Sequence, residues 1–331
     1  MAINYISQLK QILTVGGLSQ AALAKQLGVT FAALNRWING HAKPHPAKAI
    51  TIQKLYQELV GFPSVTEKEL KRLIKKAADL KKSGLWNFIA RNSSIQDDLL
   101  LEHTYNSNAI EGSTFNKKET EAVIFGKSVV PDKSLKEHLE VTNHAALLRD
   151  ILQKKYHGPI TEEFIKMMHQ HLMQGIREDA GEYSKFPRAI RGLDIALTHP
   201  EDIPEEMQNL IRDLGKKSVR RSIKEIGDFH VQFELIHPFG DGNGRIGRLI
   251  MAIQCLEIGY PPIVIENKRK MEYYEVLEYA QKKSDGPFIR FLVDEMEKTN
   301  NILRRHMPIM QLRGFLRGKN ISFKREKNDR T

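Results

Sequence analysis

The chain has 331 residues, and 41% of them are apolar, which is enough to bury a core and excludes the disordered class. The net charge of +11 indicates a polyanionic partner. No uninterrupted apolar run of about 18 residues is present, which excludes a predicted membrane span. One cysteine, Cys255, cannot form an internal disulfide, and the first residues lack a secretion signal. We therefore expect a cytoplasmic protein with no membrane partner.

The positive charge lies at the two ends of the chain. Residues 1–60 carry six basic side chains and one acidic one, and residues 303–331 carry nine basic and two acidic ones. The stretch between them is close to neutral. This distribution predicts that a polyanion would contact the ends and not the middle of the chain.

Residues 5–60 show the pattern of a small helical unit. Ser19 is placed as the cap of a helix, Gly28 as a turn, and Thr30 as the cap of the next helix. The spacing over Gln20–Asn39 resembles the Cro/repressor-type helix-turn-helix family, and the likeness covers about 55 residues.

That resemblance implies DNA binding through the exposed side of the second helix. Asn35 is the strongest candidate for reading a base, and dimerisation is implied because a single such module binds DNA weakly. The alternative is a helical bundle used for protein contacts, and the charge of the unit favours DNA. The predicted DNA-binding residues are Thr30, Phe31, Asn35 and Arg36.

A break at residues 61–64 predicts a domain boundary. We expect a helix-turn-helix domain at 1–62, a second domain at 63–300 and a basic tail at 301–331. A charged helix predicted from Thr66 to Lys82 would either pack on the second domain or bridge the two domains.

Further along, a helix is predicted to end at Gly112, with Glu111 in its last turn. A carboxylate there opposes the negative end of the helix dipole, at a cost of ~0.3–1 kcal/mol. This misfit indicates a partner elsewhere in the chain. Residues 115–175 are predicted to be helical, whereas residues 180–197 have no helical period and favour a short β-hairpin or an irregular loop.

The most informative stretch is HPFGDGNGRIGR at residues 237–248, which lies between two apolar helices. Its glycines allow backbone N–H groups to approach an anion, and the second helix opens near Asn243 with its positive dipole end at the same place. Arg245 and Arg248 suit phosphate oxygens, Asp241 suits Mg²⁺, and His237 can take a proton at neutral pH. The alternative is a glycine-rich turn with solvated charges.

This stretch resembles the H-P-F-x-[DE]-G-N-G-R-x-x-R signature of the Fic (Fic/Doc) family at every fixed position, and the likeness runs from about Ile95 to Glu297. The resemblance implies an all-α catalytic domain with a short β-hairpin flap. It also implies transfer of AMP from Mg-ATP to a hydroxyl of a protein.

By the same resemblance, His237 would deprotonate the target hydroxyl and Asp241 would bind Mg²⁺. The α- and β-phosphates would lie against Gly242, Asn243 and Gly244. Arg245 and Arg248 would hold the β- and γ-phosphates.

Two further segments resemble family motifs. Ser107, Glu111 and Gly112 match the inhibitory [ST]-x-x-x-E-[GN] motif, in which the glutamate pairs with the second arginine, here Arg248. The family's flap begins with G-x-[YF]-R and clamps the target by adding a strand to it. Here Ser184 stands where the family pattern has arginine, which leaves the orientation of the target open. The predicted flap residues are Lys185, Ala189 and Ile190.

A tyrosine-rich helix at residues 271–281 resembles the family's helix beside the adenine. Tyr274 would stack on the base or bond to it, and Gln281 would bond to it two turns later. The alternative is that these tyrosines belong to the core.

The sequence therefore predicts a protein adenylyltransferase that acts on a Tyr, Ser or Thr hydroxyl, uses ATP and Mg²⁺, and is inhibited by Glu111. Other family chemistries stay open, including removal of AMP and transfer of phosphate, UMP or phosphocholine. A DNA-binding regulator whose second domain senses nucleotide is the alternative from another class. Homo-oligomerisation is also possible.

Overall fold

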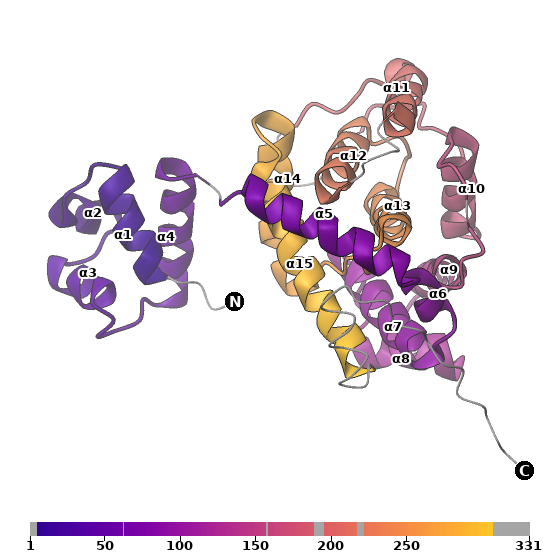
Figure 1. Cartoon of the computed structure of the whole chain (residues 1–331), viewed down its shortest axis with the longest axis horizontal. Helices are drawn as coiled ribbons and strands as arrows, with labels where there is room; N and C mark the ends of the chain where they lie inside the picture. Colours follow the sequence, from indigo (N-terminus) through magenta and orange to yellow (C-terminus); the bar gives the residue numbers. More distant parts are fainter. Residues whose placement is uncertain (1–4, 62, 157, 189–194, 217–221, 307–331) are drawn as a thin grey trace, which may run out of the picture. The chain divides into compact units, whose positions relative to one another are not determined.

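The computed structural model describes residues 5–61, 63–156, 158–188, 195–216 and 222–306. These residues form α-helices, two short 3₁₀-helices and turns, and they contain no strand. The chain divides into two compact units, Met1–Pro63 and Ser64–Thr331 (Figure 1). In the described residues no helix combines the length and the apolar character needed to cross a membrane.

The described residues of the first unit, 5–61 and 63, form four helices around one apolar core. Its helices are α1 (Tyr5–Val15), α2 (Gln20–Gln26), α3 (Phe31–Ile38) and α4 (Pro46–Leu59). The Ser19 hydroxyl accepts a hydrogen bond from the amide of Ala22 at 3.1 Å, and Thr30 accepts one from Ala33 at 3.2 Å. Both predicted caps are therefore confirmed. The core is formed mainly by Leu9, Ile12, Leu23, Leu27, Leu34, Trp37, Ile52 and Leu55.

The second unit is built around α13 (Asn243–Ile258), whose residues from Arg245 to Leu256 are all buried. This burial follows from its neighbours, since α13 contacts helices on several sides. They are α5 (Glu67–Lys82), α6 (Leu85–Ala90), α7 (Ser93–Ile110), α9 (Leu135–Leu152), α10 (Glu162–Met173) and α12 (Ile223–Ile236).

The other helices complete the second unit. They are α8 (Lys117–Gly126), η1 (Pro200–Asp202), α11 (Ile203–Lys216), η3 (Asn267–Arg269), α14 (Lys270–Lys282) and α15 (Gly286–Arg305). The helix α15 buries Ile302 and Leu303, so the boundary expected at residue 300 falls inside it.

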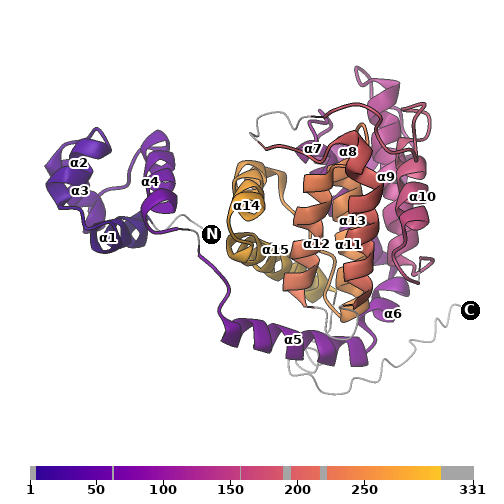
Figure 2. The ribbon, with the colours of Figure 1, turned by 90° about the horizontal axis from the view of Figure 1, so that it is seen from above.

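The charged helix predicted from Thr66 packs on the second unit. As α5 it begins with a capping box formed by Thr66 and Glu69 and buries Leu73, Ala77 and Leu80. It lies across one end of α12 and α13 (Figure 2).

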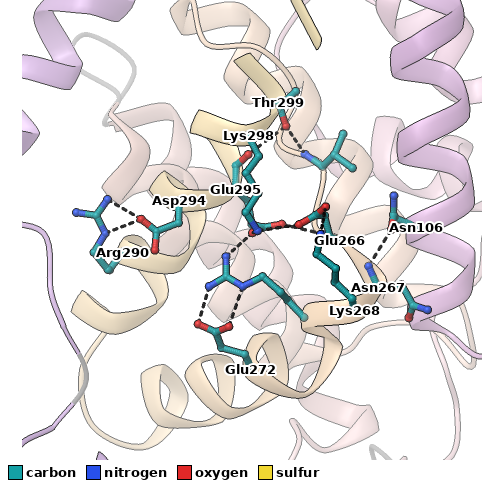
Figure 3. A network of polar contacts seen from close by, with 12 residues as sticks. Asn106, Glu266, Asn267, Lys268, Glu272, Arg290, Asp294, Glu295, Lys298 and Thr299 are labelled. Atoms are coloured by element: carbon teal, nitrogen blue, oxygen red, sulfur yellow. Dashed lines mark hydrogen bonds and ion pairs between the residues drawn. The ribbon is translucent and has the colours of Figure 1, made fainter. Parts of the chain in front are cut away.

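A network of ion pairs fixes the connection between α13 and α14 (Figure 3). The carboxylate of Glu295 is fully buried, pairs with Arg269 and Lys298, and accepts a hydrogen bond from the Glu266 amide at 2.9 Å. The amide of Asn267 donates to Asn106 of α7 at 2.8 Å. These contacts hold the start of α14 beside α7.

The β-hairpin flap is not seen. The described residues on either side of 189–194 form turns without a strand. Ala189 and Ile190, two of the three residues predicted to dock a target, lie outside the described residues.

We expect Gly259→Ala to destabilise the second unit by at least ~3 kcal/mol. Gly259 ends α13 with φ +100°, and an added Cβ would lie 2.2 Å from the Ala77 carbonyl oxygen and 2.7 Å from the Lys81 amide nitrogen of α5. Backbone atoms of a packed helix cannot move aside cheaply. Thermal and urea unfolding would measure the loss.

Gly112→Ala is the matched control for this substitution. Gly112 has φ +101°, but its added Cβ would meet no atom within 4 Å. It should therefore cost only the ~1–2 kcal/mol of the left-handed backbone conformation. Equal losses for the two variants would contradict the close seating of α5 on Gly259.

Candidate active site

The signature loop connects the end of α12 to the start of α13. His237 caps α12 in the left-handed conformation with φ 50°, and Gly242 precedes α13 with φ 82°. A Cβ on Gly242 would lie 2.1 Å from the Met173 methyl group. The loop therefore favours glycine here for its backbone conformation, while the flexible Met173 side chain packs closely against it.

Two buried side chains hold the loop in shape. The Asn243 amide accepts a hydrogen bond from the Phe239 N–H at 2.9 Å and donates one to the Phe239 carbonyl at 2.8 Å. His169 stacks on Phe239 at 3.7 Å. The prediction that Asn243 contacts phosphate can therefore hold only for its backbone, because its side chain braces the loop.

The tautomer of His169 follows from its partners. Its Nδ1 accepts from the Gly181 N–H at 2.8 Å, and its Nε2 lies 3.0 Å from the Asp241 carbonyl oxygen. Burial lowers the pKa of His169 to about 4, so the ring is neutral at pH 7. Its Nε2–H thus donates to the loop, a bracing role that the sequence did not indicate.

Arg248 is buried and pairs with the end of α7. Its side chain is 2% exposed, its Nη2 lies 2.6 Å from a Glu111 oxygen, and its Nε donates to the Ser107 hydroxyl at 2.9 Å. Burial alone would lower the pKa of Arg248, but the Glu111 charge raises it, so the guanidinium stays charged. The structure thus brings together Ser107, Glu111 and Arg248.

The Glu111 carboxylate also lies against the first turn of α13. A Cβ on Gly244 would be 2.2 Å from a Glu111 oxygen and 2.9 Å from Arg248. The first N–H groups of a helix have no partner within it and attract anions. A carboxylate therefore occupies the place that the sequence assigned to an anion.

Arg245 reaches a different set of partners. Its guanidinium lies 3.0 Å from Glu140 of α9 and 3.2 Å from Asp241. Arg245 and Arg248 therefore form ion pairs with different partners. Glu140 lies on a distant helix outside every motif, so the sequence carried no signal for it.

The Asp241 carboxylate fits a role in holding a cation. Its Oδ1 accepts from the Gly242 N–H at 2.6 Å and from Arg245, which leaves Oδ2 for other contacts. The side chain is 37% exposed. No group of three or more potential metal ligands occurs in the described residues. One carboxylate together with substrate phosphates is, however, a set that Mg²⁺ accepts.

His237 lies at the rim of this site with 18% of its side chain exposed, and its Nδ1 is 3.6 Å from Glu234 of α12.

Two contacts connect the loop that follows His237 to the residues before 189. Arg188 donates to the His237 carbonyl, and the Ser184 N–H donates to the Pro238 carbonyl at 2.9 Å. Ser184 thus has a structural role where the family pattern has arginine. Lys185 is exposed and pairs with Glu182 at 3.2 Å.

Two predicted adenine contacts lie on α14. Tyr274 is partly buried, and burial raises the pKa of its hydroxyl, so it stays protonated. Both polar atoms of the Gln281 amide are buried and have no hydrogen-bond partner among the described residues. A buried amide without partners is costly unless another group satisfies it.

On the first unit, the predicted DNA-binding residues differ in how exposed their side chains are. Asn35 is half-buried, and its amide lies within hydrogen-bond distance of Gln20 at 3.4 Å and Asn39 at 3.0 Å. Thr30 caps α3 and is exposed, as are Phe31 and Arg36. Three of the four predicted DNA-binding residues are therefore accessible.

Comparisons with known proteins agree with this architecture. Residues 159–255 match the Fic/DOC family, and residues 9–58 match a helix-turn-helix family. The chain is 33% identical over 204 residues to the protein adenylyltransferase Fic of Nematostella vectensis, covering 60% of this chain and 47% of that protein. It is 26% identical over 264 residues to the protein of the same name from Aedes aegypti. This match covers 76% of this chain and 52% of that protein. The chain thus spans about half the length of these relatives.

Solved structures show the same fold. A Fic-domain-containing signaling protein from Bacteroides thetaiotaomicron is 25% identical, with a TM-score of 0.56 over 76% of this chain and 99% of that one. Fic-1 from C. elegans is 19% identical, with a TM-score of 0.64 over 92% of this chain and 99% of that one. This chain therefore contains a Cro/repressor-type helix-turn-helix domain, followed by a domain of the Fic/DOC family.

Proposed function

We propose that this chain is a protein adenylyltransferase that moves AMP from Mg-ATP to a Tyr, Ser or Thr hydroxyl of a protein. The observation that carries the proposal is the Glu111 carboxylate, which lies against Gly244 and pairs with the buried Arg248 at 2.6 Å. A site that holds one oxyanion at a helix N-terminus suits another, and phosphate is the oxyanion with the matching geometry. The names of the related proteins agree with this chemistry.

In this reaction His237 takes the proton of the target hydroxyl. The hydroxyl oxygen then bonds to the α-phosphorus, the bond from that phosphorus to the bridging oxygen breaks, and pyrophosphate leaves. The backbone N–H groups at Gly242–Gly244 would hold phosphate oxygens, and Arg245 and Arg248 would offset their charge. Tyr274 and Gln281 would contact the adenine, for which the unpartnered Gln281 amide provides a donor and an acceptor.

The Asp241 carboxylate would hold Mg²⁺ through Oδ2. When bound, the ion offsets the negative charge of the phosphates. Arg245 orients Asp241 through its contact at 3.2 Å, and Glu140 on its other side keeps Arg245 in place.

We further propose that Glu111 inhibits the enzyme. Arg248 would be hindered from holding the γ-phosphate while Glu111 and Ser107 engage its Nη2 and Nε groups. The contact at Gly244 places the Glu111 carboxylate beside the start of α13 as well. Nucleotide would then bind without the orientation that transfer needs.

For the first unit we propose DNA binding through α3. The exposed Phe31 and Arg36 are available to contact DNA, and residues 1–60 carry six basic side chains and one acidic one. An enzyme with such a unit could act at, or report to, a DNA site.

We expect His237→Ala to lower AMP transfer by a factor on the order of 10²–10⁴, because a general base contributes about that much. Labelling from ATP that carries a tagged α-phosphate measures it. His171→Ala, which changes an exposed histidine of α10, should label like the unchanged chain. Undiminished labelling by the His237 variant would remove it from the mechanism.

We expect Glu111→Gly to raise auto-modification at least tenfold, equivalent to about 1.4 kcal/mol in favour of productive nucleotide binding. The same variant leaves Arg248 buried without its anion, so its melting temperature should fall and ATP should restore it. Ser113→Gly, which also introduces glycine but removes no charge, is the control two residues further on. If both variants label as the unchanged chain does, Glu111 is not inhibitory.

We expect Arg36→Ala in the full chain to weaken binding to a short duplex selected by the unchanged protein, and to reduce its salt dependence by about one counterion. Lys10→Ala removes an exposed charge from α1 instead and should have a smaller effect. Equal effects in a gel-shift titration would indicate attraction by net charge without a contact from α3.

A further inference from the structure

The buried carboxylate of Glu234 lies one helical turn before His237 on α12. Its side chain is about 4% exposed, and its Oε2 is 3.6 Å from His237 Nδ1. Its Oε1 is 3.9 Å from Nε2 of His230. Glu234 Oε1 and His237 Nδ1 both lack a hydrogen-bond partner among the described residues. A small rotation would close the gap to His237, and such contacts commonly tighten when substrate binds.

Glu234 lacks the cations that a buried carboxylate ordinarily requires. Glu295 of α15 is equally buried, and both Arg269 and Lys298 pair with it (Figure 3). In the described part of the chain, the ion-pair contacts of Glu234 are with two histidines. An ionised carboxylate without a cation is costly in such surroundings. Glu234 is therefore best stabilised when one of these imidazoles carries a charge.

His230 is unsuited to carry that charge. Its Nε2 lies 2.8 Å from the Tyr273 hydroxyl, and burial lowers its pKa to about 4. The charge of Arg248 also acts on Glu234, but the ion pair of Arg248 in the described residues is with Glu111. Burial alone would raise the pKa of Glu234, whereas His237, His230 and Arg248 together lower it, so the carboxylate stays ionised. That leaves His237 as the group whose protonation Glu234 can stabilise.

We propose that Glu234 is a positioning residue for the transfer reaction: it accepts the Nδ1–H of His237, leaves Nε2 unprotonated toward the target hydroxyl, and stabilises the imidazolium that forms. This rests on the proposed function. The arrangement follows the logic of a carboxylate that orients a catalytic imidazole. The proton moves from the hydroxyl to Nε2, while Nδ1–H stays with His237 throughout.

A purely structural role would have a different signature. Glu234 also packs at the crossing of α12 and α13, where a Cβ on Gly247 would lie 3.1 Å from its Oε1. Loss of packing would lower stability without changing which nitrogen of His237 carries the proton. The tautomer of His237 therefore separates the two roles.

The test uses the full chain carrying Glu111→Gly, with ¹⁵N-labelled histidine, and compares Glu234→Gln with Glu225→Gln on the same helix. His237→Ala identifies the His237 signals. We expect the Nδ1–H tautomer in the parent and in the Glu225 variant. In the Glu234 variant we expect a shift toward Nε2–H, because the new amide can donate to Nδ1. Its kcat should fall on the order of 10²-fold or more, with the KM for ATP unchanged.

The outcomes separate this proposal from the proposed function. An unchanged tautomer in Glu234→Gln, or a changed tautomer with an unchanged kcat, would overturn the positioning role. If no form of the chain transfers AMP and yet Glu234→Gln changes the tautomer, the proposed reaction fails while the orientation of His237 by Glu234 stands. Should Glu234→Gln not fold, Glu234→Asp moves the carboxylate away by one methylene and should produce a smaller change in both measurements.

Discussion

A buried guanidinium needs an anion, and this requirement organises the second unit. Arg248 is 2% exposed in the first turns of the central helix α13, so its charge must be paired inside the protein. The end of α7 supplies the anion through Glu111 and two acceptors through Ser107. α7 is consequently held against the helix start that would receive phosphates. Under the proposed function, the same buried guanidinium would serve both nucleotide binding and its inhibition.

Around that helix start, several polar side chains already contact partners from distant parts of the chain. Asn243 and His169 brace the loop, Glu140 holds Arg245, and Glu234 faces His237. Catalysis of phosphoryl and nucleotidyl transfer depends mostly on position and charge. Under the proposed function, release of the Glu111 contact would be the main rearrangement that the site requires.

The basic side chains are unevenly distributed along the chain, which is consistent with separate partners for its parts. Residues 1–60 are basic, whereas the stretch between residues 61 and 302 is close to neutral. Buried ion pairs in the second unit neutralise its charges within the fold, as Figure 3 shows for Glu295. In the first unit, the basic side chain of Arg36 on α3 is left exposed. A polyanion would therefore meet the first unit in preference to the near-neutral stretch of residues 61–302.

The sequence by itself determined the features that depend on near neighbours. The caps at Ser19 and Thr30, the end of α7 near Gly112 and the start of α13 at Asn243 follow from local spacing and backbone preference, and the structure has them. The pairing of Glu111 with Arg248 was also expected, but only through resemblance to a known motif.

Only the tertiary structure decided which distant side chains meet. Glu140 on α9 pairs with Arg245, and His169 on α10 bonds to the loop 72 residues away. Asn35, predicted to read a base, also contacts Gln20 and Asn39. These contacts depend on how helices pack, and helix periodicity specifies which face is buried without specifying what lies opposite it. Glu234 is the intermediate case, since its helical spacing places it beside His237, but only the packing of α12 on α13 shows that it is buried without a cation.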